Sequence, residues 1–123
     1  MKNINIEEII NNLNNLNIID IRDSYLYNIG NIPYSINIPM NFIMMNPDNY
    51  IDKNKEYYIY CNYGVNSQKL CSFLNNKGYN VININGGYNS YKLYTHKIWR
   101  KVYLFISELY WHLFNKKCKI KLQ

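Results

Sequence analysis

The sequence predicts a single α/β domain built on a mostly parallel central sheet, with helices on both faces and a helical extension at the C-terminus. Two observations support this prediction. Short apolar runs rich in β-branched and aromatic residues alternate with stretches of helical spacing, which is typical of parallel sheets with crossover helices. The length of 123 residues leaves room for one hydrophobic core. We place the domain at residues 1–94 and the extension at residues 95–123.

The first part of the chain is expected to form a helix followed by a buried strand. Asn5 and Glu8 have the spacing of a capping box, in which side chains satisfy free backbone groups at the start of a helix. Apolar residues then recur on one face, so this helix should run to about Leu16. The next run, NIIDIR at residues 17–22, is apolar and β-branched before it ends in charge. That pattern is typical of a buried strand.

Short elements are expected in the middle of the chain. Ser24 is a candidate cap for one helical turn, which a glycine and a proline then follow. A second strand should lie at about residues 35–38. The stretch after it is irregular, with turns of helix expected at residues 42–45 and after Pro47.

The second half of the chain continues the alternation of strand and helix. EYYIYC at residues 56–61 reads as a strand, and the helix expected at residues 66–77 should end at Gly78. VININ at residues 81–85 is the next predicted strand. A further helix should open at about Tyr88.

The charge is concentrated near the C-terminus. The formal net charge is +6, and residues 97–121 hold seven lysines and arginines against the single acid Glu108. We therefore expect an anionic surface to be met by this segment alone, and we expect no nucleic-acid partner. The sequence lacks an 18-residue uncharged apolar run, and MKNINIEEII lacks the pattern of a signal peptide. A cytoplasmic location, either free or peripheral to a membrane, is expected.

The cysteines and histidines do not form a disulfide or metal pattern. Cys61, Cys71 and Cys118 are odd in number and match no disulfide or zinc spacing, which favours a reducing compartment. Cys71 lies among apolar residues of a predicted helix and is expected in the core. Cys118 lies among lysines, where it is either a reactive thiol or incidental. His96 and His112 lack further ligands at metal spacing, so we expect no metal and no cofactor.

Cys61 is the residue with the clearest chemical potential. It ends a strand and opens a loop that leads into a helix, so loop N–H groups and the positive helix end should favour its thiolate. Gly64 would let the loop curl into an anion-binding nest, and Ser67 could add a hydroxyl. The alternative is a small apolar residue buried at the end of a strand.

Three segments together resemble the rhodanese family. IIDIRDSYLYNIGNIPYSINIP at residues 18–39 is similar to the family's opening signature, with its Asp-x-Arg and Gly-x-Ile-Pro. YYIYCNYGVNSQKL at residues 57–70 resembles its active-site segment, and NINGGY at residues 83–88 resembles its Gly-Gly motif. The three segments occur in the family's order and spacing, and together they cover residues 3 to about 92.

The resemblance implies a rhodanese-like fold and a sulfurtransferase whose nucleophile is Cys61. In this family the cysteine takes a sulfane sulfur from a small-molecule or protein-bound donor and passes the sulfur to a thiol or another thiophilic acceptor. Asp20 and Arg22 match the Asp-x-Arg and are expected to support the active-site loop. The substrate-binding loop implied by the match consists of Asn62, Tyr63, Gly64, Val65, Asn66 and Ser67.

The sequence departs from the family pattern in ways that bear on the substrate. Many active members carry a basic residue in the loop, often at Asn66, whereas this loop has no charge. A charge-assisted contact to dianionic thiosulfate would be missing, so we expect low thiosulfate activity. Asn31 replaces the histidine of Gly-His-Ile-Pro, with little catalytic consequence expected. Ser67 stands where cysteine phosphatases have an oxyanion-binding arginine, which disfavours phosphatase chemistry.

The C-terminal extension has the pattern of an amphipathic helix. At 100° per residue, an apolar stripe runs from Ile98 to Leu113, and aromatic residues widen it to about half the circumference. Leu104 and Trp111 lie on the opposite side. Three interpretations stay open: residues 97–123 pack on the domain, contact a second copy, or lie on a membrane surface. The last two suit a non-catalytic module that binds a protein or a membrane, which is the alternative to the enzyme.

Overall fold

The computed structural model describes residues 2–121, and for residues 117–121 it describes the backbone alone. The chain divides into two compact units, one ending at Lys92 and one beginning at Leu93. Cys118 and the lysines beside it therefore lie outside the side chains that the structure describes.

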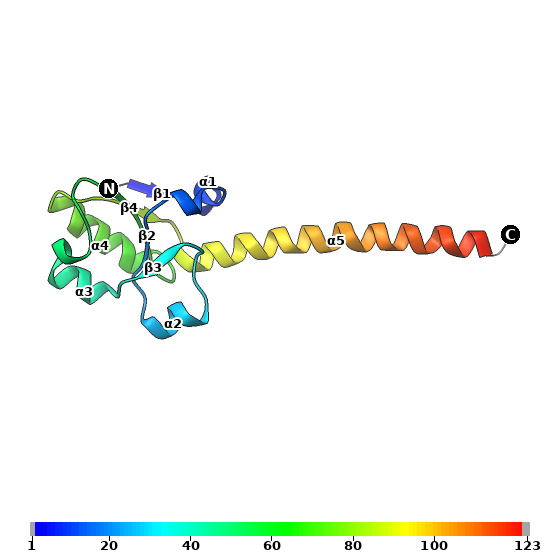
Figure 1. The fold of residues 1–123 in the computed structure, drawn as a ribbon, viewed down its shortest axis with the longest axis horizontal. Coiled ribbons are helices and arrows are strands. Elements are labelled where there is room, and N and C mark those ends of the chain that lie inside the picture. The colour runs from blue at the N-terminus through cyan, green and yellow to red at the C-terminus, as the bar shows by residue number, and fades with distance from the viewer. Residues whose placement is uncertain (1, 122–123) are drawn as a thin grey trace. The chain divides into compact units, whose positions relative to one another are not determined.

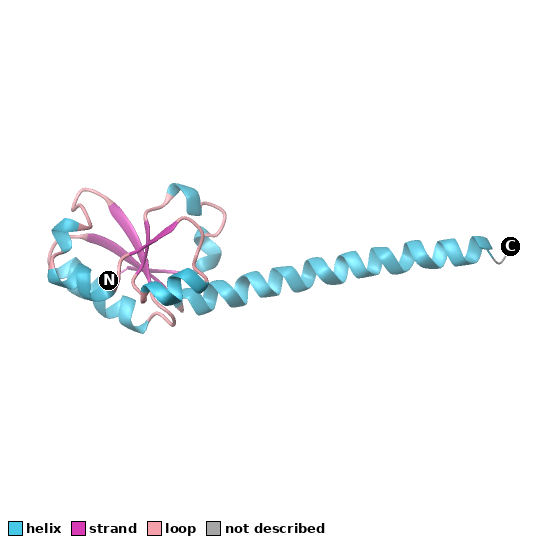
Figure 2. Ribbon diagram, turned by 60° about the horizontal axis from the view of Figure 1, so that its bottom comes forward, coloured by secondary structure: helices cyan, strands magenta, loops and turns pink. Residues whose placement is uncertain are grey.

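The first unit is built on a parallel sheet, as the sequence predicts (Figure 2). Within residues 2–92 the sheet has five strands in the order β1-β5-β4-β2-β3, and every pairing is parallel. Four of these strands match predicted ones, whereas β1 was not predicted, because its sequence KNI has a single apolar residue and so no strand pattern. The strands are β1 (Lys2–Ile4), β2 (Ile18–Asp20), β3 (Ser35–Asn37), β4 (Glu56–Tyr60) and β5 (Asn80–Ile84).

Helices connect these strands, and a last helix follows β5 (Figure 1). They are α1 (Ile6–Ile9), α2 (Ser24–Ile29), α3 (Met40–Met45), α4 (Val65–Asn76) and α5 (Gly87–Lys121), with the 3₁₀ turns η1 (Leu13–Asn15) and η2 (Pro47–Asn49). The predicted capping box is present at the start of α1, where the Asn5 N–H donates to the Glu8 carboxylate at 2.9 Å. Gly78 follows α4 with a φ of +93°, as expected for a residue that ends a helix.

The first helix is shorter than predicted. It ends at Ile9 instead of running to Leu16, and the chain resumes as η1. The intervening segment is rich in asparagine, whose amide competes for hydrogen bonds with the helical backbone. In this segment the Asn15 side chain donates to the Asn12 side-chain oxygen at 2.6 Å.

Apolar residues cover both faces of the sheet. Ile19, Ile59 and Val81 point to one face and form a buried cluster with residues of α3 and α4, including Ile43, Leu70, Cys71 and Leu74. Neighbouring residues of the same strands point to the other face and are buried as well, among them Ile18, Tyr60 and Ile84. Because successive strand residues point to opposite faces, burial at both positions confirms the prediction of a sheet covered on each side.

The predicted helix after residue 88 and the C-terminal helix are one continuous element. This helix, α5, runs from Gly87 to Lys121 and so belongs to both units. Taken by itself, the second unit is helical from Leu93 to Lys121. No helix within the described part of the chain is long and apolar enough to cross a membrane.

Candidate active site

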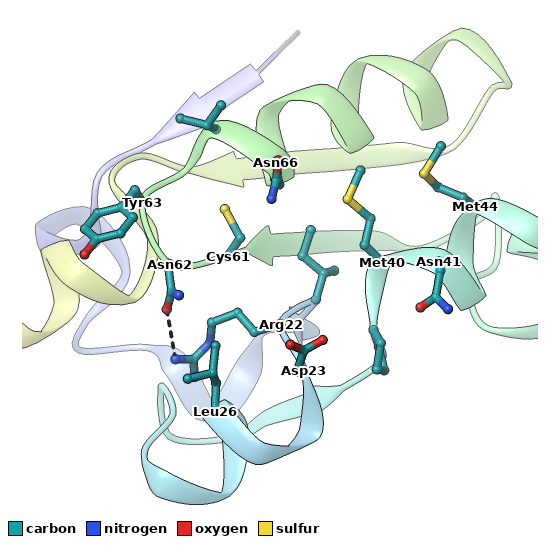
Figure 3. Close-up of a pocket in the computed structure, with 13 residues that line it drawn as sticks. Arg22, Asp23, Leu26, Met40, Asn41, Met44, Cys61, Asn62, Tyr63 and Asn66 are labelled. Atoms are coloured by element: carbon teal, nitrogen blue, oxygen red, sulfur yellow. Dashed lines mark hydrogen bonds between the residues drawn. The ribbon is translucent and has the colours of Figure 1, made fainter.

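Cys61 follows β4 directly and lies where that strand meets the loop leading to α4 (Figure 3). Its side chain is 7% exposed. The loop folds back so that two backbone N–H groups point at the sulfur. The Gly64 N–H donates to Sγ at 3.2 Å, and the Ser67 N–H donates to it at 3.4 Å. An anionic sulfur at this position would be stabilised by both amides.

Gly64 is required for this curled loop on two grounds. It precedes the first residue of α4 with a φ of +89°, a conformation that residues with a Cβ rarely adopt. A Cβ at this position would also lie 2.9 Å from the backbone nitrogen of Gly86. The glycine therefore allows both the turn and the close approach of the Gly86 segment.

The Gly86-Gly87 pair brings the start of α5 against the loop. The Tyr88 N–H donates to the Cys61 carbonyl at 2.8 Å, and the Asn89 N–H donates to the Asn62 carbonyl at 2.9 Å. A Cβ on Gly87 would lie 2.1 Å from the Cys61 carbonyl oxygen. The first amides of α5 thus hold the carbonyls of the loop while the amides of the loop stay directed at the sulfur.

A chain of side-chain hydrogen bonds continues inward from the sulfur. The Cys61 thiol donates to Ser67 Oγ at 3.3 Å, and the Ser67 hydroxyl donates to Asn83 Oδ1 at 2.6 Å. The Asn83 amide in turn donates to Asn3 Oδ1 at 3.0 Å. When Cys61 loses its proton, the Ser67 hydroxyl can donate to the thiolate only by giving up its hydrogen bond to Asn83.

The balance of burial and hydrogen bonding favours the Cys61 thiolate. Burial by itself raises the pKa of the thiol, because the charged form loses solvation. The Ser67 hydroxyl and the amides of Ser67, Gly64 and Tyr63 stabilise the thiolate and together have the larger effect. The pKa of Cys61 is therefore lower than the ordinary value for a cysteine, which is the property that a nucleophilic cysteine needs near neutral pH.

Asp20 and Arg22 form a buried ion pair beside the loop. Arg22 Nη2 lies 2.7 Å from Asp20 Oδ2, and Arg22 Nε donates to both Asp20 oxygens. The remaining nitrogen, Nη1, donates to Asn62 Oδ1 at 3.2 Å (Figure 3). Nη2 also donates to the Gly30 carbonyl, and the guanidinium lies 4.2 Å from the centre of the Tyr88 ring. Arg22 therefore links β2 to the first residue after Cys61.

An open cleft of about 630 Å³ leads to Cys61. Met40 and Met44 lie on one side of the sulfur and Tyr63 on the other (Figure 3). The charged residues that line the cleft are Arg22 and Asp23. The nitrogens of Arg22 are engaged by Asp20, Asn62 and Gly30. The full lining is Ile21, Arg22, Asp23, Leu26, Pro39, Met40, Asn41, Met44, Cys61, Asn62, Tyr63, Val65 and Asn66.

The predicted loop residues divide into two groups. Asn62, Tyr63, Val65 and Asn66 line the cleft, so they face an incoming molecule. Gly64 and Ser67 instead contact the sulfur from the protein side. The two groups together surround Cys61, and each predicted loop position therefore has a place either in the cleft or beneath the sulfur.

Cys71 lies away from this cleft. It is fully buried in the core cluster, and burial raises the pKa of its thiol to about 12. Its sulfur is therefore a core group rather than a second reactive thiol.

Among the described residues there is no group of three or more histidine, cysteine or acidic side chains that could hold a metal ion.

Asn83 is the site residue that sequence reasoning missed. Its side chain is 2% exposed and accepts the Ser67 hydrogen bond from within β5. A polar residue in the middle of the apolar run VININ was the available signal, because a buried amide in a strand needs partners. Asn3 was missed with it, since β1 was not predicted.

The sequence of this chain is similar to those of known proteins. The model of the rhodanese-like domain family matches residues 5–94. A Bacillus subtilis protein named "Putative sulfurtransferase YtwF" is 33% identical over 72 residues, 58% of this chain and 69% of that protein. The tRNA uridine(34) hydroxylase of Buchnera aphidicola is 30% identical over 93 residues, and the match covers 69% of this chain but 30% of that protein.

The fold has solved counterparts as well. The crystal structure of a rhodanese-like domain protein from Staphylococcus aureus is 33% identical to this chain and superposes with a TM-score of 0.66. The match covers 73% of this chain and 90% of that chain.

Proposed function

The chain belongs to the rhodanese-like domain family, and on that premise we propose that it transfers a sulfane sulfur through a persulfide formed on Cys61. The observation that carries this proposal is the direction of the Gly64 and Ser67 amides, both of which donate to Sγ. Such a cradle suits a thiolate and also a persulfide anion, because each carries one negative charge on sulfur.

The proposed reaction needs no oxidant and no cofactor. The Cys61 thiolate attacks the outer sulfur of a donor persulfide, the donor's S–S bond breaks, and the donor thiolate leaves and takes up a proton. A new S–S bond joins Cys61 to the transferred sulfur. An acceptor thiolate then attacks that outer sulfur, and Cys61 leaves as the thiolate. Hydrogen bonds from the loop amides and the Ser67 hydroxyl stabilise the thiolate at the beginning and the end of the cycle.

The cleft favours a donor of low charge. Apolar side chains such as Met40, Met44 and Leu26 line it, and its carboxylate, Asp23, would repel a dianion. The guanidinium of Arg22 is held by Asp20, Asn62 and Gly30. We therefore propose that the sulfur donor is the persulfide of a small thiol or of a protein cysteine, rather than thiosulfate, and that the acceptor is a small thiol or a protein cysteine, rather than cyanide.

A reducing compartment such as the cytoplasm suits this chemistry. Cys61 must return to the thiol form after each transfer, and both Cys61 and Cys71 are free thiols. A disulfide-forming environment would instead consume the nucleophile.

Intact-mass measurement tests the proposal. After exposure to glutathione persulfide, the protein should gain the mass of one sulfur atom, and peptide mapping should locate the gain at Cys61. Cys61→Ser should abolish it, whereas Cys71→Ala, which removes a buried thiol outside the cleft, should retain it. A second incubation with a small thiol should remove the added sulfur. Absence of any gain with persulfide or thiosulfate donors would contradict the enzyme and favour the non-catalytic binding module.

A further inference from the structure

The second unit has a broad apolar face. Ten apolar and aromatic side chains lie on about half the circumference of the helix at 100° per residue. Each of them is between 41% and 75% exposed. The unit is a single helix, so by itself it supplies no partner for this face. This apolar face consists of Ile98, Trp99, Val102, Tyr103, Phe105, Ile106, Leu109, Tyr110, Leu113 and Phe114.

The net positive charge of the chain comes entirely from the same segment. Residues 1–92 contain seven cationic and seven acidic side chains, and residues 93–123 contain seven cationic side chains and the single acid Glu108. The formal charge of +6 is therefore the charge of the segment that carries the exposed apolar face. Lys97, Arg100 and Lys101 lie on the side of the helix opposite the apolar stripe.

A second copy of the chain fits this pattern less well. Ile98, Val102, Phe105 and Leu109 follow the spacing of a coiled-coil seam, but the next two seam positions are polar, namely His112 and Lys116. Two heptads are fewer than a stable coiled coil requires. The apolar face is also wider than a two-stranded seam, which would leave its aromatic flank exposed.

A flat apolar surface with negative charge fits better. Interfacial helices place a wide apolar face among lipid chains and keep lysine and arginine at the level of the headgroups. Tryptophan and tyrosine are enriched at that boundary, and the apolar face has Trp99, Tyr103 and Tyr110. Anionic headgroups also complement the seven cationic side chains of the segment. We propose that residues 98–114 of α5 bind the surface of a membrane that contains anionic lipid, without crossing it.

Vesicle flotation with the full-length protein tests this inference. Phosphatidylcholine vesicles that contain phosphatidylglycerol should bind the protein at least about tenfold more tightly than vesicles of phosphatidylcholine alone. Raised salt should weaken the binding, because it screens the lysines and arginines. Equal binding to both kinds of vesicle, or binding to neither, would overturn the inference.

A matched pair of variants locates the binding face. Leu109→Glu and Ser107→Glu each add one negative charge. Leu109 belongs to the apolar face, whereas Ser107 lies on the polar side of the helix. Leu109→Glu should weaken vesicle binding at least about tenfold and Ser107→Glu by less than about threefold. Equal losses in the two variants would overturn the assignment of the face.

Sedimentation without lipid tests whether a second copy of the chain, instead of lipid, covers this face. Self-association that Leu109→Glu disrupts, combined with a failure to bind vesicles, would assign the face to a second copy and overturn the lipid proposal. The alkylation rate of Cys61 should be unchanged in both variants, which shows that the first unit remains folded.

Discussion

Ser67 is the side chain on which the reactivity of Cys61 depends most directly. Its hydroxyl and its amide both reach the sulfur, and the Gly64 amide supplies a third contact. These hydrogen bonds outweigh the effect of burial on the thiol pKa. Replacing the hydroxyl alone leaves the amides in place and thereby isolates its contribution.

Ser67→Ala should raise the pKa of Cys61. The thiolate would lose one hydrogen bond, so the rate of alkylation by iodoacetamide should rise with pH and level off at a higher pH than in the wild type. The Asn83 oxygen would also lose its donor, at a cost of about 1–3 kcal/mol in the free energy of unfolding. Site-resolved mass spectrometry across a pH series measures the change, and an unaltered midpoint would show that the amides alone set the pKa.

Asn83→Leu should shift the pKa of Cys61 in the opposite direction. In the wild type the Ser67 hydroxyl donates to Asn83, and loss of that acceptor frees the hydroxyl to donate to the thiolate. Leucine has the same number and branching of side-chain heavy atoms as asparagine, so the substitution should open no cavity. The same alkylation series should level off at a lower pH than in the wild type. A shift in the same direction as Ser67→Ala would mean that Asn83 acts by holding the hydroxyl in place.

At the level of single residues, the sequence predicted Cys61 and the loop that follows it. It missed the cleft residues that other elements supply, such as Met40 and Met44, and the two asparagines behind Ser67. Cys61 and its loop follow a strand and precede a helix, which is visible in the sequence pattern. Asn83 reaches Ser67 through the pairing of β5 with β4, and Asn3 reaches Asn83 through the pairing of β1 with β5. Pairing between strands far apart in the sequence is not encoded in any local pattern, so the sequence did not place these two residues at the site.

Among the elements, the start of α5 matters most for the site. Its first amides bind the carbonyls of Cys61 and Asn62, and Gly87 makes that approach sterically feasible. The sequence showed Gly86-Gly87 only as a motif before a helix. The structure supplies its physical reason, namely the contact between the helix start and the active-site loop.

Gly87→Ala should impair both stability and reactivity. The added Cβ would collide with the Cys61 carbonyl, so the loop and α5 would have to separate. We expect a loss of more than about 2 kcal/mol in urea unfolding, together with a slower alkylation of Cys61 near neutral pH.

Gly78→Ala is the matched control for that substitution. Gly78 also has a positive φ, but the nearest atom to its added Cβ would be Lys53 Cε at 4.0 Å. It should cost only the conformational strain of about 1–2 kcal/mol and leave the alkylation rate of Cys61 unchanged. Equal effects of the two glycine substitutions on alkylation would refute the supporting role of the α5 start.

Other elements show what local patterns can and cannot determine. The strands with apolar β-branched runs were predicted to within a few residues, because burial on both faces requires that composition. The first helix was overextended, since its apolar spacing continued through asparagines that end the helix. Helix α5 was predicted in two parts, because the change from an internal segment to an extension is a change in surroundings and not in helical spacing.

For the molecule as a whole, the distribution of charge separates two kinds of contact. The unit that contains the cleft is formally neutral over residues 1–92, so it presents no excess charge to attract a dianion. The cationic excess belongs to the segment after residue 92. The proposed sulfur transfer and the proposed attraction to an anionic surface therefore depend on different parts of the chain.

Thiosulfate should be a poor donor for the wild type and a better one for Asn66→Arg. Asn66 lines the cleft, and an arginine there would offer the charged hydrogen bond that the loop lacks. Such a bond is worth about 1.5–3 kcal/mol, so kcat/KM for thiosulfate should rise roughly tenfold to a hundredfold. Asn66→Gln, which is neutral, is the control. An equal rise in both variants would show that charge does not limit thiosulfate use.

The parallel sheet also determines when the chain acquires its chemistry. Parallel strands pair across long stretches of sequence and therefore assemble slowly during folding. The loop around Cys61 is held by the amides of Tyr88 and Asn89, which follow β5, and β5 pairs with β4. The lowered pKa of Cys61 therefore depends on the assembled sheet. An unfolded chain carries a cysteine of ordinary pKa at this position.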